Sequence, residues 1–276
     1  MLGKKHITKH EDWLRAWDSC TDIYSKDYID SLTEKTIQRL YNTIDKFDID
    51  TSRMGYGWSG GKDSVVLGDI LSKTKYNKDL RGYCSIYPLY YDAFLKYIEK
   101  NKPSNVETFL NDRIDEKFIN ENPKYLFNSD ESMYLREWST LSRYVENKFY
   151  KNNDLSMNIV GRRTLDGNCI RKTDNLPIQF TKDKNIYAMI YDWKHEELLA
   201  YIKYNNLKLC DMYFYKDGFR YGTRLWVERD PLGSLKENLD EIWNLDKNTI
   251  INSAKKGLIV SQNYLKEINY NGYTKN

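Results

Sequence analysis

Short apolar runs alternate along the chain with segments whose apolar residues recur at helical spacing. Strands are expected at 54–58, 81–87, 156–160 and 186–191, and 106–110 is either a further strand or the first turn of a helix. Helices are expected at 63–73, 90–99, 133–150 and 195–204, with two in 11–48 and two or three in 235–268. This alternation predicts an α/β fold: a Rossmann-like, mostly parallel sheet with helices on both faces, plus helical N- and C-terminal extensions.

The expected division of the chain follows the same pattern. Residues 1–50 form an N-terminal helical extension, 51–230 an α/β domain, and 231–276 a C-terminal helical extension. With 276 residues, 40% apolar residues and 30% charged residues, the composition is that of a soluble globular protein. No signal peptide or membrane span is recognised, so no membrane partner and a cytoplasmic location are expected. The net charge of +3 is too small to indicate a nucleic-acid-binding protein by itself.

The segment 54–67, MGYGWSGGKDSVVL, carries the most informative chemistry in the sequence. Gly60 and Gly61 bring no Cβ, so backbone N–H groups can close around an anion at the start of the next helix. Ser59 and Ser64 add hydroxyl donors, and Lys62 adds a positive charge. Asp63 is a helix cap or a tentative ligand of Mg²⁺ on a polyphosphate. The spacing is not that of a Walker A loop, and a plain Gly-rich turn is the alternative.

Ser59-Gly60-Gly61-Lys62-Asp63-Ser64 matches the PP-loop motif Ser-Gly-Gly-x-Asp-Ser. The chain therefore resembles the adenine nucleotide alpha hydrolase (PP-loop ATP pyrophosphatase) superfamily, and within it the phosphoadenosine phosphosulfate (PAPS) reductase-like group. The resemblance covers roughly 54–229. It implies an adenine nucleotide, ATP or a sulfated adenylate (PAPS or APS), bound at the carboxyl ends of the strands, with Lys62 and Asp63 in catalytic roles.

A second segment strengthens the resemblance. Gly161-Arg162-Arg163-Thr164-Leu165-Asp166-Gly167 is similar to the Gly-Ile-Arg-x-x-Glu-Ser segment of PAPS reductase-like proteins. On that match Arg163 takes the place of the family arginine, also catalytic, and Asp166 that of the acid. Guanidinium groups grip phosphate or sulfate oxygens in pairs. A surface loop tied by Arg–Asp pairs is the alternative. The remaining residues expected at the nucleotide are Gly161, Arg162, Arg171 and Arg224.

Two later segments are interpreted more structurally. Residues 190–197 resemble the family's strand followed by a helix start, with Asp192 as the helix N-cap. His195 has no second ligand nearby in sequence and is a poor metal ligand. Residues 215–222 are similar to a Tyr-x-x-Gly-Tyr segment of the family. There, either an arginine reaches the nucleotide or the segment is a hairpin with solvated arginines.

The cysteines depart from the pattern of the sulfonucleotide reductases. Those enzymes use a cysteine in a C-terminal Glu-Cys-Gly segment, whereas here no cysteine follows Cys210. The four cysteines are far apart and include no C-x-x-C pair: Cys20, Cys84, Cys169 and Cys210. We therefore expect ATP (or PAPS/APS) and Mg²⁺, but neither an iron–sulfur cluster nor zinc.

Three functions remain open at this point. The first is an enzyme that cleaves ATP to AMP or an adenylate and pyrophosphate to activate a substrate, in nucleic-acid modification or sulfur transfer by family analogy. The second is a sulfonucleotide reductase or transferase that relies on a partner thiol. The third is a non-catalytic nucleotide sensor or partner-binding module. Expected partners are the adenine nucleotide and a nucleic-acid or protein acceptor, and the helical extensions are compatible with a homodimer.

Overall fold

The computed structural model describes residues 2, 7–127, 131–167, 170–182, 184–270 and 272 of the chain, with the side chains of 131–139 and 142 outside this description. Its strands are β1 (Met54–Gly57), β2 (Arg81–Ile86), β3 (Val106–Leu110), β4 (Met157–Val160), β5 (Ile178–Gln179) and β6 (Asn185–Ala188). Its α-helices are α1 (His10–Ile23), α2 (Lys26–Phe47), α3 (Lys62–Ser72), α4 (Asp92–Asn101), α5 (Glu116–Glu121), α6 (Glu131–Asn152), α7 (His195–Tyr204), α8 (Gly218–Tyr221), α9 (Leu235–Lys255) and α10 (Ile259–Glu267). The short 3-10 helices are η1 (Thr51–Arg53), η2 (Pro123–Tyr125), η3 (Thr164–Asp166), η4 (Asp211–Phe214) and η5 (Trp226–Glu228).

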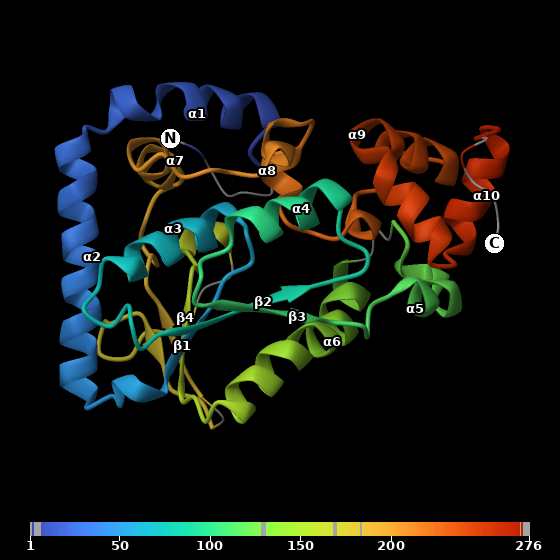
Figure 1. Ribbon diagram of the computed structural model, residues 1–276. Helices are drawn as coiled ribbons and strands as arrows, with labels where there is room; N and C mark the ends of the chain where they lie inside the picture. Colours follow the sequence, from blue (N-terminus) through green and yellow to red (C-terminus); the bar gives the residue numbers. More distant parts are fainter. Residues whose placement is uncertain are drawn as a thin grey trace. The chain divides into compact units, whose positions relative to one another are not determined.

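One sheet contains all six strands, in the order β3-β2-β1-β4-β6-β5 (Figure 1). β1 pairs in parallel with β2 and β4, and β4 pairs in parallel with β6, whereas the two-residue β5 runs antiparallel at the edge. The chain builds outward from β1 to β3 and then returns to the other side of β1 with β4. The predicted mostly parallel α/β sheet is therefore confirmed, with a topological switch point between β1 and β4.

Helices cover both faces of the sheet at β1. A Cβ at Gly68 of α3 would lie 3.2 Å from the Trp58 ring, so α3 packs on the face that Tyr56 and Trp58 share. A Cβ at Gly55 would lie 2.7 Å from Leu155 and 3.2 Å from the Tyr150 hydroxyl, so the end of α6 packs on the opposite face. The close approach of the end of α6 leaves no room for a larger side chain at position 55 of β1.

The chain divides into two compact units, the first made of Met1–Cys84, Asn101–Glu107 and Lys148–Gly222. In this unit α1 and α2 are the two helices expected in 11–48, and both pack against α7. Trp13 and Ile29 lie inward, with 1% and 0% of their surface exposed. The three-segment division expected from the sequence, at residues 50 and 230, stays a prediction.

The second unit contains Ser85–Lys100, Thr108–Asn147 and Thr223–Asn276. The expected C-terminal helices are α9 and α10, which pack on each other. Within α9, Asp246 has non-helical dihedral angles, and its carboxylate accepts a hydrogen bond from the Thr249 hydroxyl at 3.0 Å. Arg229 is buried in this unit and pairs with Glu241 at 2.8 Å.

Three local expectations need correction. Asp192 is not the N-cap of α7: the helix is preceded by Lys194, whose N–H is bound by Glu197, while Asp192 pairs with Arg39 at 2.7 Å. The segment 186–191 leaves the sheet at Ala188, because 189–191 turn toward α7. The 215–222 segment is not a hairpin, since it follows η4 directly and contains the short helix α8.

Candidate functional site

The glycine-rich loop lies between β1 and α3, at the carboxyl end of β1. Gly60 has φ +71°, a left-handed conformation that glycine adopts without a Cβ clash. Gly61 is the N-cap residue of α3 and has no capping side chain. The loop therefore turns the chain directly into the N-terminal end of a helix, where backbone N–H groups and the helix dipole favour an anion.

Two serines hold the loop in shape. The Ser64 hydroxyl donates to the Gly61 carbonyl at 2.9 Å and accepts the Ser59 N–H at 3.0 Å. The hydroxyls of Ser59 and Ser64 are 3.2 Å apart. Ser64 is buried, whereas Ser59 is exposed at the mouth of the loop. Ser64 thus stabilises the conformation of the loop, whereas the hydroxyl of Ser59 is accessible to a ligand.

The second predicted segment reaches the same place. Gly161 follows β4 directly, and a Cβ on it would lie 3.1 Å from the Asp63 carbonyl oxygen. Arg163 follows, with no exposed surface. Because β1 and β4 are parallel neighbours, their carboxyl ends share one edge, and that edge is the switch point where open α/β sheets place their ligands. The two segments predicted to act together do meet in the structure.

Asp63 lies between two cations. Its Oδ1 accepts the Arg163 Nε–H at 2.7 Å, and its Oδ2 accepts the Lys62 ammonium at 2.7 Å. Both cations are buried, with side-chain exposures of 0% for Arg163 and 1% for Lys62. In this arrangement the Asp63 carboxylate is an ion-pair centre of the protein, and the predicted role of Asp63 as an Mg²⁺ ligand stays a prediction.

Arg163 uses its guanidinium to join four groups. Besides Asp63, it donates to Asp166 Oδ1 at 3.0 Å, to the Trp193 carbonyl at 3.3 Å and to His195 Nδ1 at 2.9 Å. A guanidinium can only donate, so His195 Nδ1 accepts and the ring proton is on Nε2. Arg163 thus organises the site from inside the protein, and its predicted catalytic and ligand-binding role stays a prediction.

The Lys62 side chain is also covered by Trp13 of the first helix, α1. Its Nζ lies 5.7 Å from the ring centre of Trp13, within cation–π range. Burial lowers the pKa of the Lys62 ammonium and Asp63 opposes that change, while the nearby Arg163 lowers it further. The Lys62 N–H donates to the Tyr213 hydroxyl at 2.8 Å. Tyr213 thus satisfies a backbone donor at the start of α3.

The other predicted residues lie differently. Arg162 is half-buried beside Arg163, Arg171 is exposed, and Arg224 is exposed and belongs to the second unit. Cys169 lies outside the described residues. Sequence reasoning missed Trp13 and Tyr213, and it considered His195 only as a metal ligand. Their contribution depends on contacts between segments far apart in the chain, which spacing does not reveal.

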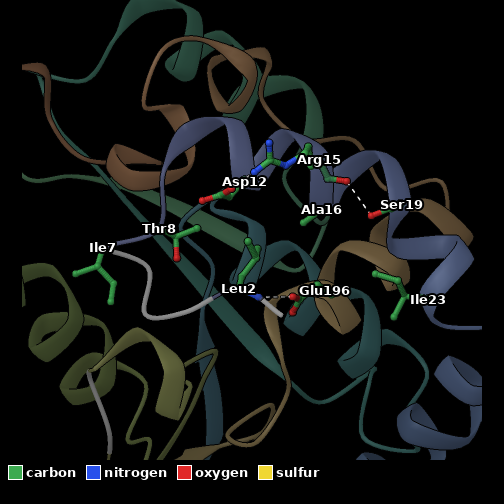
Figure 2. Close-up of a pocket in the computed structure, with 9 residues that line it drawn as sticks. All are labelled: Leu2, Ile7, Thr8, Asp12, Arg15, Ala16, Ser19, Ile23 and Glu196. Atoms are coloured by element: carbon green, nitrogen blue, oxygen red, sulfur yellow. Dashed lines mark hydrogen bonds and ion pairs between the residues drawn. The ribbon is translucent and has the colours of Figure 1, made fainter.

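A cavity of about 450 Å³ lies beside α1 (Figure 2). Its lining combines polar side chains with apolar ones: Leu2, Ile7, Thr8, Asp12, Arg15, Ala16, Ser19, Ile23 and Glu196. The buried carboxylate of Glu196 accepts a hydrogen bond from the backbone N–H of Leu2. None of these residues belongs to the loop or to the Arg163 cluster.

Comparison with known families gives a decisive match. The sequence model of the phosphoadenosine phosphosulfate reductase domain matches residues 53–221, which include the loop and the Arg163 segment. The chain belongs to this family. The match confirms the resemblance based on the PP-loop, and it makes this protein a PAPS reductase-like member of the adenine nucleotide alpha hydrolases. A comparison with proteins of curated function finds no significant match.

Several solved structures of enzymes are similar to this PAPS reductase-like chain. PAPS reductase from Candida auris, solved as a phosphate complex, shares 16% identity over 68% of this chain and 90% of its own, with a TM-score of 0.43. The U34-tRNA thiolase NcsA from Methanococcus maripaludis shares 15% over 90% and 81%, with a TM-score of 0.41. FMN adenylyltransferase from Candida glabrata, in complex with ATP, shares 15% over 86% and 88%, with a TM-score of 0.42.

The cofactor expectation is wrong in its exclusion of an iron–sulfur cluster. The NcsA structure carries a [4Fe-4S] cluster, so the argument from unpaired cysteines does not exclude this cofactor class. Folding can bring together cysteines that are far apart in the sequence, and their spacing along the chain does not predict this. Among the described residues, Cys20, Cys84 and Cys210 are buried, and no three His, Cys, Asp or Glu side chains are grouped to hold a metal. We therefore derive no step of the function through a cluster.

The described helices include none that is both long and apolar enough to cross a membrane. The predicted adenine-nucleotide partner is consistent with the family. The nucleic-acid or protein acceptor and the homodimer stay predictions.

Proposed function

We propose that this chain binds an adenine nucleotide at the PP-loop and cleaves ATP between its α- and β-phosphates. The observation that carries the proposal is the convergence of the loop and the Gly161–Asp166 segment at the β1/β4 switch point, where a Cβ on Gly161 would come within 3.1 Å of Asp63. Phosphate oxygens would face the loop and the N-terminal end of α3, and Ser59 would donate from the exposed side.

In the proposed reaction, a nucleophile attacks the α-phosphorus and the bond to the β-phosphate oxygen breaks. Pyrophosphate leaves with that oxygen and its electron pair, and the adenylyl group remains on the acceptor. With water as nucleophile the products are AMP and pyrophosphate. A nucleic-acid or sulfur-accepting substrate in place of water would be activated as its adenylate.

The roles of the charged residues in this proposal follow from their burial. Lys62, Asp63 and Arg163 hold the loop in a fixed geometry, because they satisfy one another inside the protein. A loop held in this way presents its backbone N–H groups in a fixed arrangement. Groups preorganised like this stabilise the charge that develops in the transition state without having to rearrange. In this proposal Arg162, which is half-buried and lies two residues after β4, contacts the phosphates from the edge of the site. That Arg171 and Arg224 also contact the nucleotide stays a prediction.

A second function is sulfonucleotide reduction with a partner's thiol, and one observation bears on which thiol such a reaction could use. Burial raises the pKa of the Cys84 thiol to about 12 and also raises that of Cys20, so neither is a ready thiolate nucleophile. A reductase built on this chain would therefore depend on Cys169, on Cys210 or on a thiol from another protein.

The test incubates the purified chain with ATP in a magnesium-containing buffer and identifies the products. AMP and pyrophosphate in equal amounts would support the proposal. A parallel reaction contains PAPS and thioredoxin, and sulfite release there would favour the second function. Tight nucleotide binding with no product in either reaction would identify a nucleotide-sensing module instead.

A further inference from the structure

The N-terminal helix α1 contributes Trp13 to the interior of the loop's ion-pair cluster, although α1 lies before the matched family domain at 53–221. The indole is 1% exposed. It stacks on Phe219 with ring centres 5.0 Å apart and planes 2° from parallel, and it meets the His195 ring edge-on at 4.5 Å. Two neighbouring rings thus fix the orientation of Trp13.

The face of Trp13 is directed at the Lys62 ammonium, 5.7 Å from the ring centre. An ammonium group carries three N–H donors, and Lys62 places one of them on Asp63 Oδ2 at 2.7 Å. A desolvated cation gains electrostatic attraction from the negative face of an indole. Trp13 therefore offers a buried Lys62 a second favourable partner in place of water.

The position of the Lys62 ammonium affects the conformation of the loop through Asp63. The Asp63 carboxylate is shared between Lys62 and Arg163, so a shift of the ammonium alters the balance at both oxygens. Asp63 also lies in the first turn of α3, two residues after Gly61. Charged groups facing this cluster come from three segments: Asp63 from α3, Arg163 and Asp166 from the turn after β4, and His195 from α7.

We propose that Trp13 is a positioning residue of the nucleotide site: its indole face holds the Lys62 ammonium against Asp63, and so fixes the loop that binds phosphate. The inference rests on the proposed function of the loop. It makes the N-terminal extension a part of the site rather than a separate appendage.

Trp17 offers a matched control on the same helix. It is half-buried and meets Phe214 edge-on, at 5.2 Å between ring centres. Replacing it with leucine removes an indole of the same helix without altering the partner of Lys62. A loss of affinity caused by general loosening of α1 would appear in Trp17→Leu as well.

The experiment is a calorimetric titration of ATP into the full chain and its variants. Trp13→Leu should weaken binding about 3- to 30-fold, the range that corresponds to a desolvated cation–π contact. Trp13→Phe, which keeps an aromatic face, should stay within about 3-fold of wild type, and Trp17→Leu should be unchanged. In a Lys62→Met background, Trp13→Leu should have no further effect, because the two residues act through one contact.

Site-specific incorporation of fluorinated tryptophans at position 13 gives a second measurement if Trp13→Leu fails to fold. Successive fluorines weaken the negative face of the ring with little change in shape, so affinity for ATP should fall stepwise. A flat series, or a full effect of Trp13→Leu in the Lys62→Met background, would overturn the inference. Absence of ATP binding by the wild-type chain would instead defeat the proposed function itself.

Discussion

Arg163 is the residue on which the geometry of the site most depends. It is fully buried and joins Asp63, Asp166, His195 and the Trp193 carbonyl. Removing one partner of a buried ion pair costs more than the pair contributes, because the remaining charge stays desolvated. Arg163→Ala should therefore lower the free energy of unfolding by about 3–5 kcal/mol. Urea denaturation measures this directly.

Arg162 is the matched control for this change. It is adjacent in sequence and half-buried. Arg162→Ala should alter stability by no more than about 0.5 kcal/mol, as is typical of surface substitutions. Arg163→Lys should recover only part of the loss, because one ammonium cannot reach both carboxylates as the guanidinium does. Equal destabilisation by the two alanine variants would show that the Arg163 cluster is not the structural centre.

The buried Cys84 thiol leads to a separate prediction, about how stability and thiol ionisation depend on pH. Burial raises the pKa of its thiol from 9.0 to about 12. The folded chain therefore prefers the protonated thiol, and the stability linked to it is complete below the unfolded pKa and is lost as the pH rises from about 9 toward 12. At pH 9 the native thiol should be about one-thousandth ionised.

The measurement is iodoacetamide labelling at pH 9, resolved by residue in a mass spectrometer. Native Cys84 should react far more slowly than Cys84 in the urea-unfolded chain, because only the thiolate is nucleophilic. Labelling of Cys84 at equal rates in the two states would contradict the burial described here and reopen a reductase role for this thiol.

At the residue scale, the sequence predicted that Lys62, Asp63 and Arg163 belong together, and the structure joins them. The prediction worked because each lies in a short motif beside a strand end. It could not reveal that Lys62 is buried, since that depends on Trp13 from a helix about 50 residues earlier. His195 likewise had no partner nearby in sequence, yet folding brings it to Arg163.

At the element scale, β4 and α3 approach each other through Gly161. A Cβ there would lie 3.1 Å from the backbone carbonyl of Asp63, and backbone cannot move aside as a flexible side chain does. Gly161→Val should lower stability by about 1–3 kcal/mol, the usual cost of overpacking. It should also displace the first turn of α3 and weaken nucleotide binding. Thermal unfolding and ATP titration check the two effects, and a fully native response in both would contradict the contact.

The start of α3 depends on Tyr213 from η4. Its hydroxyl accepts the Lys62 N–H at 2.8 Å, the kind of contact an N-cap side chain makes. Tyr213→Phe should lower the free energy of unfolding by about 1–2 kcal/mol, since a buried N–H would lose its acceptor. Tyr215→Phe is the control, because Tyr215 is 42% exposed. Denaturation curves that do not separate the two variants would rule out this capping role.

The elements themselves followed the sequence pattern closely where a period was sustained. Both N-terminal helices, α7 and the parallel strands lie where apolar spacing predicted them. The pattern failed where individual side-chain and backbone contacts, some between distant segments, decided the outcome. Asp192 resembled an N-cap, but its carboxylate is taken by Arg39 from α2 at 2.7 Å, a partner 153 residues away. The 215–222 segment contains the short helix α8, and a Cβ on Gly218 would lie 2.0 Å from the Met212 carbonyl oxygen of η4.

For the whole molecule, the sheet order places the ends of β1 and β4 together, and this one feature of topology assembles the site. The family match over 53–221 covers both strands and both motifs. The N-terminal extension adds Trp13 to the same cluster. The sequence therefore predicted the family and the nucleotide loop, while the contribution of α1 required the folded structure.

The central claim is that an adenine nucleotide binds at the PP-loop. The most direct test compares ATP binding by the wild-type chain and Gly61→Val, using calorimetry and thermal unfolding. At about 100 times its Kd, ATP should stabilise the wild type by about 2.7 kcal/mol, which is a rise of several degrees in Tm. Gly61→Val should fold but show no rise, because a side chain at Gly61 blocks close approach of phosphate to the backbone. An equal rise in Tm and an equal Kd for both proteins would contradict the account.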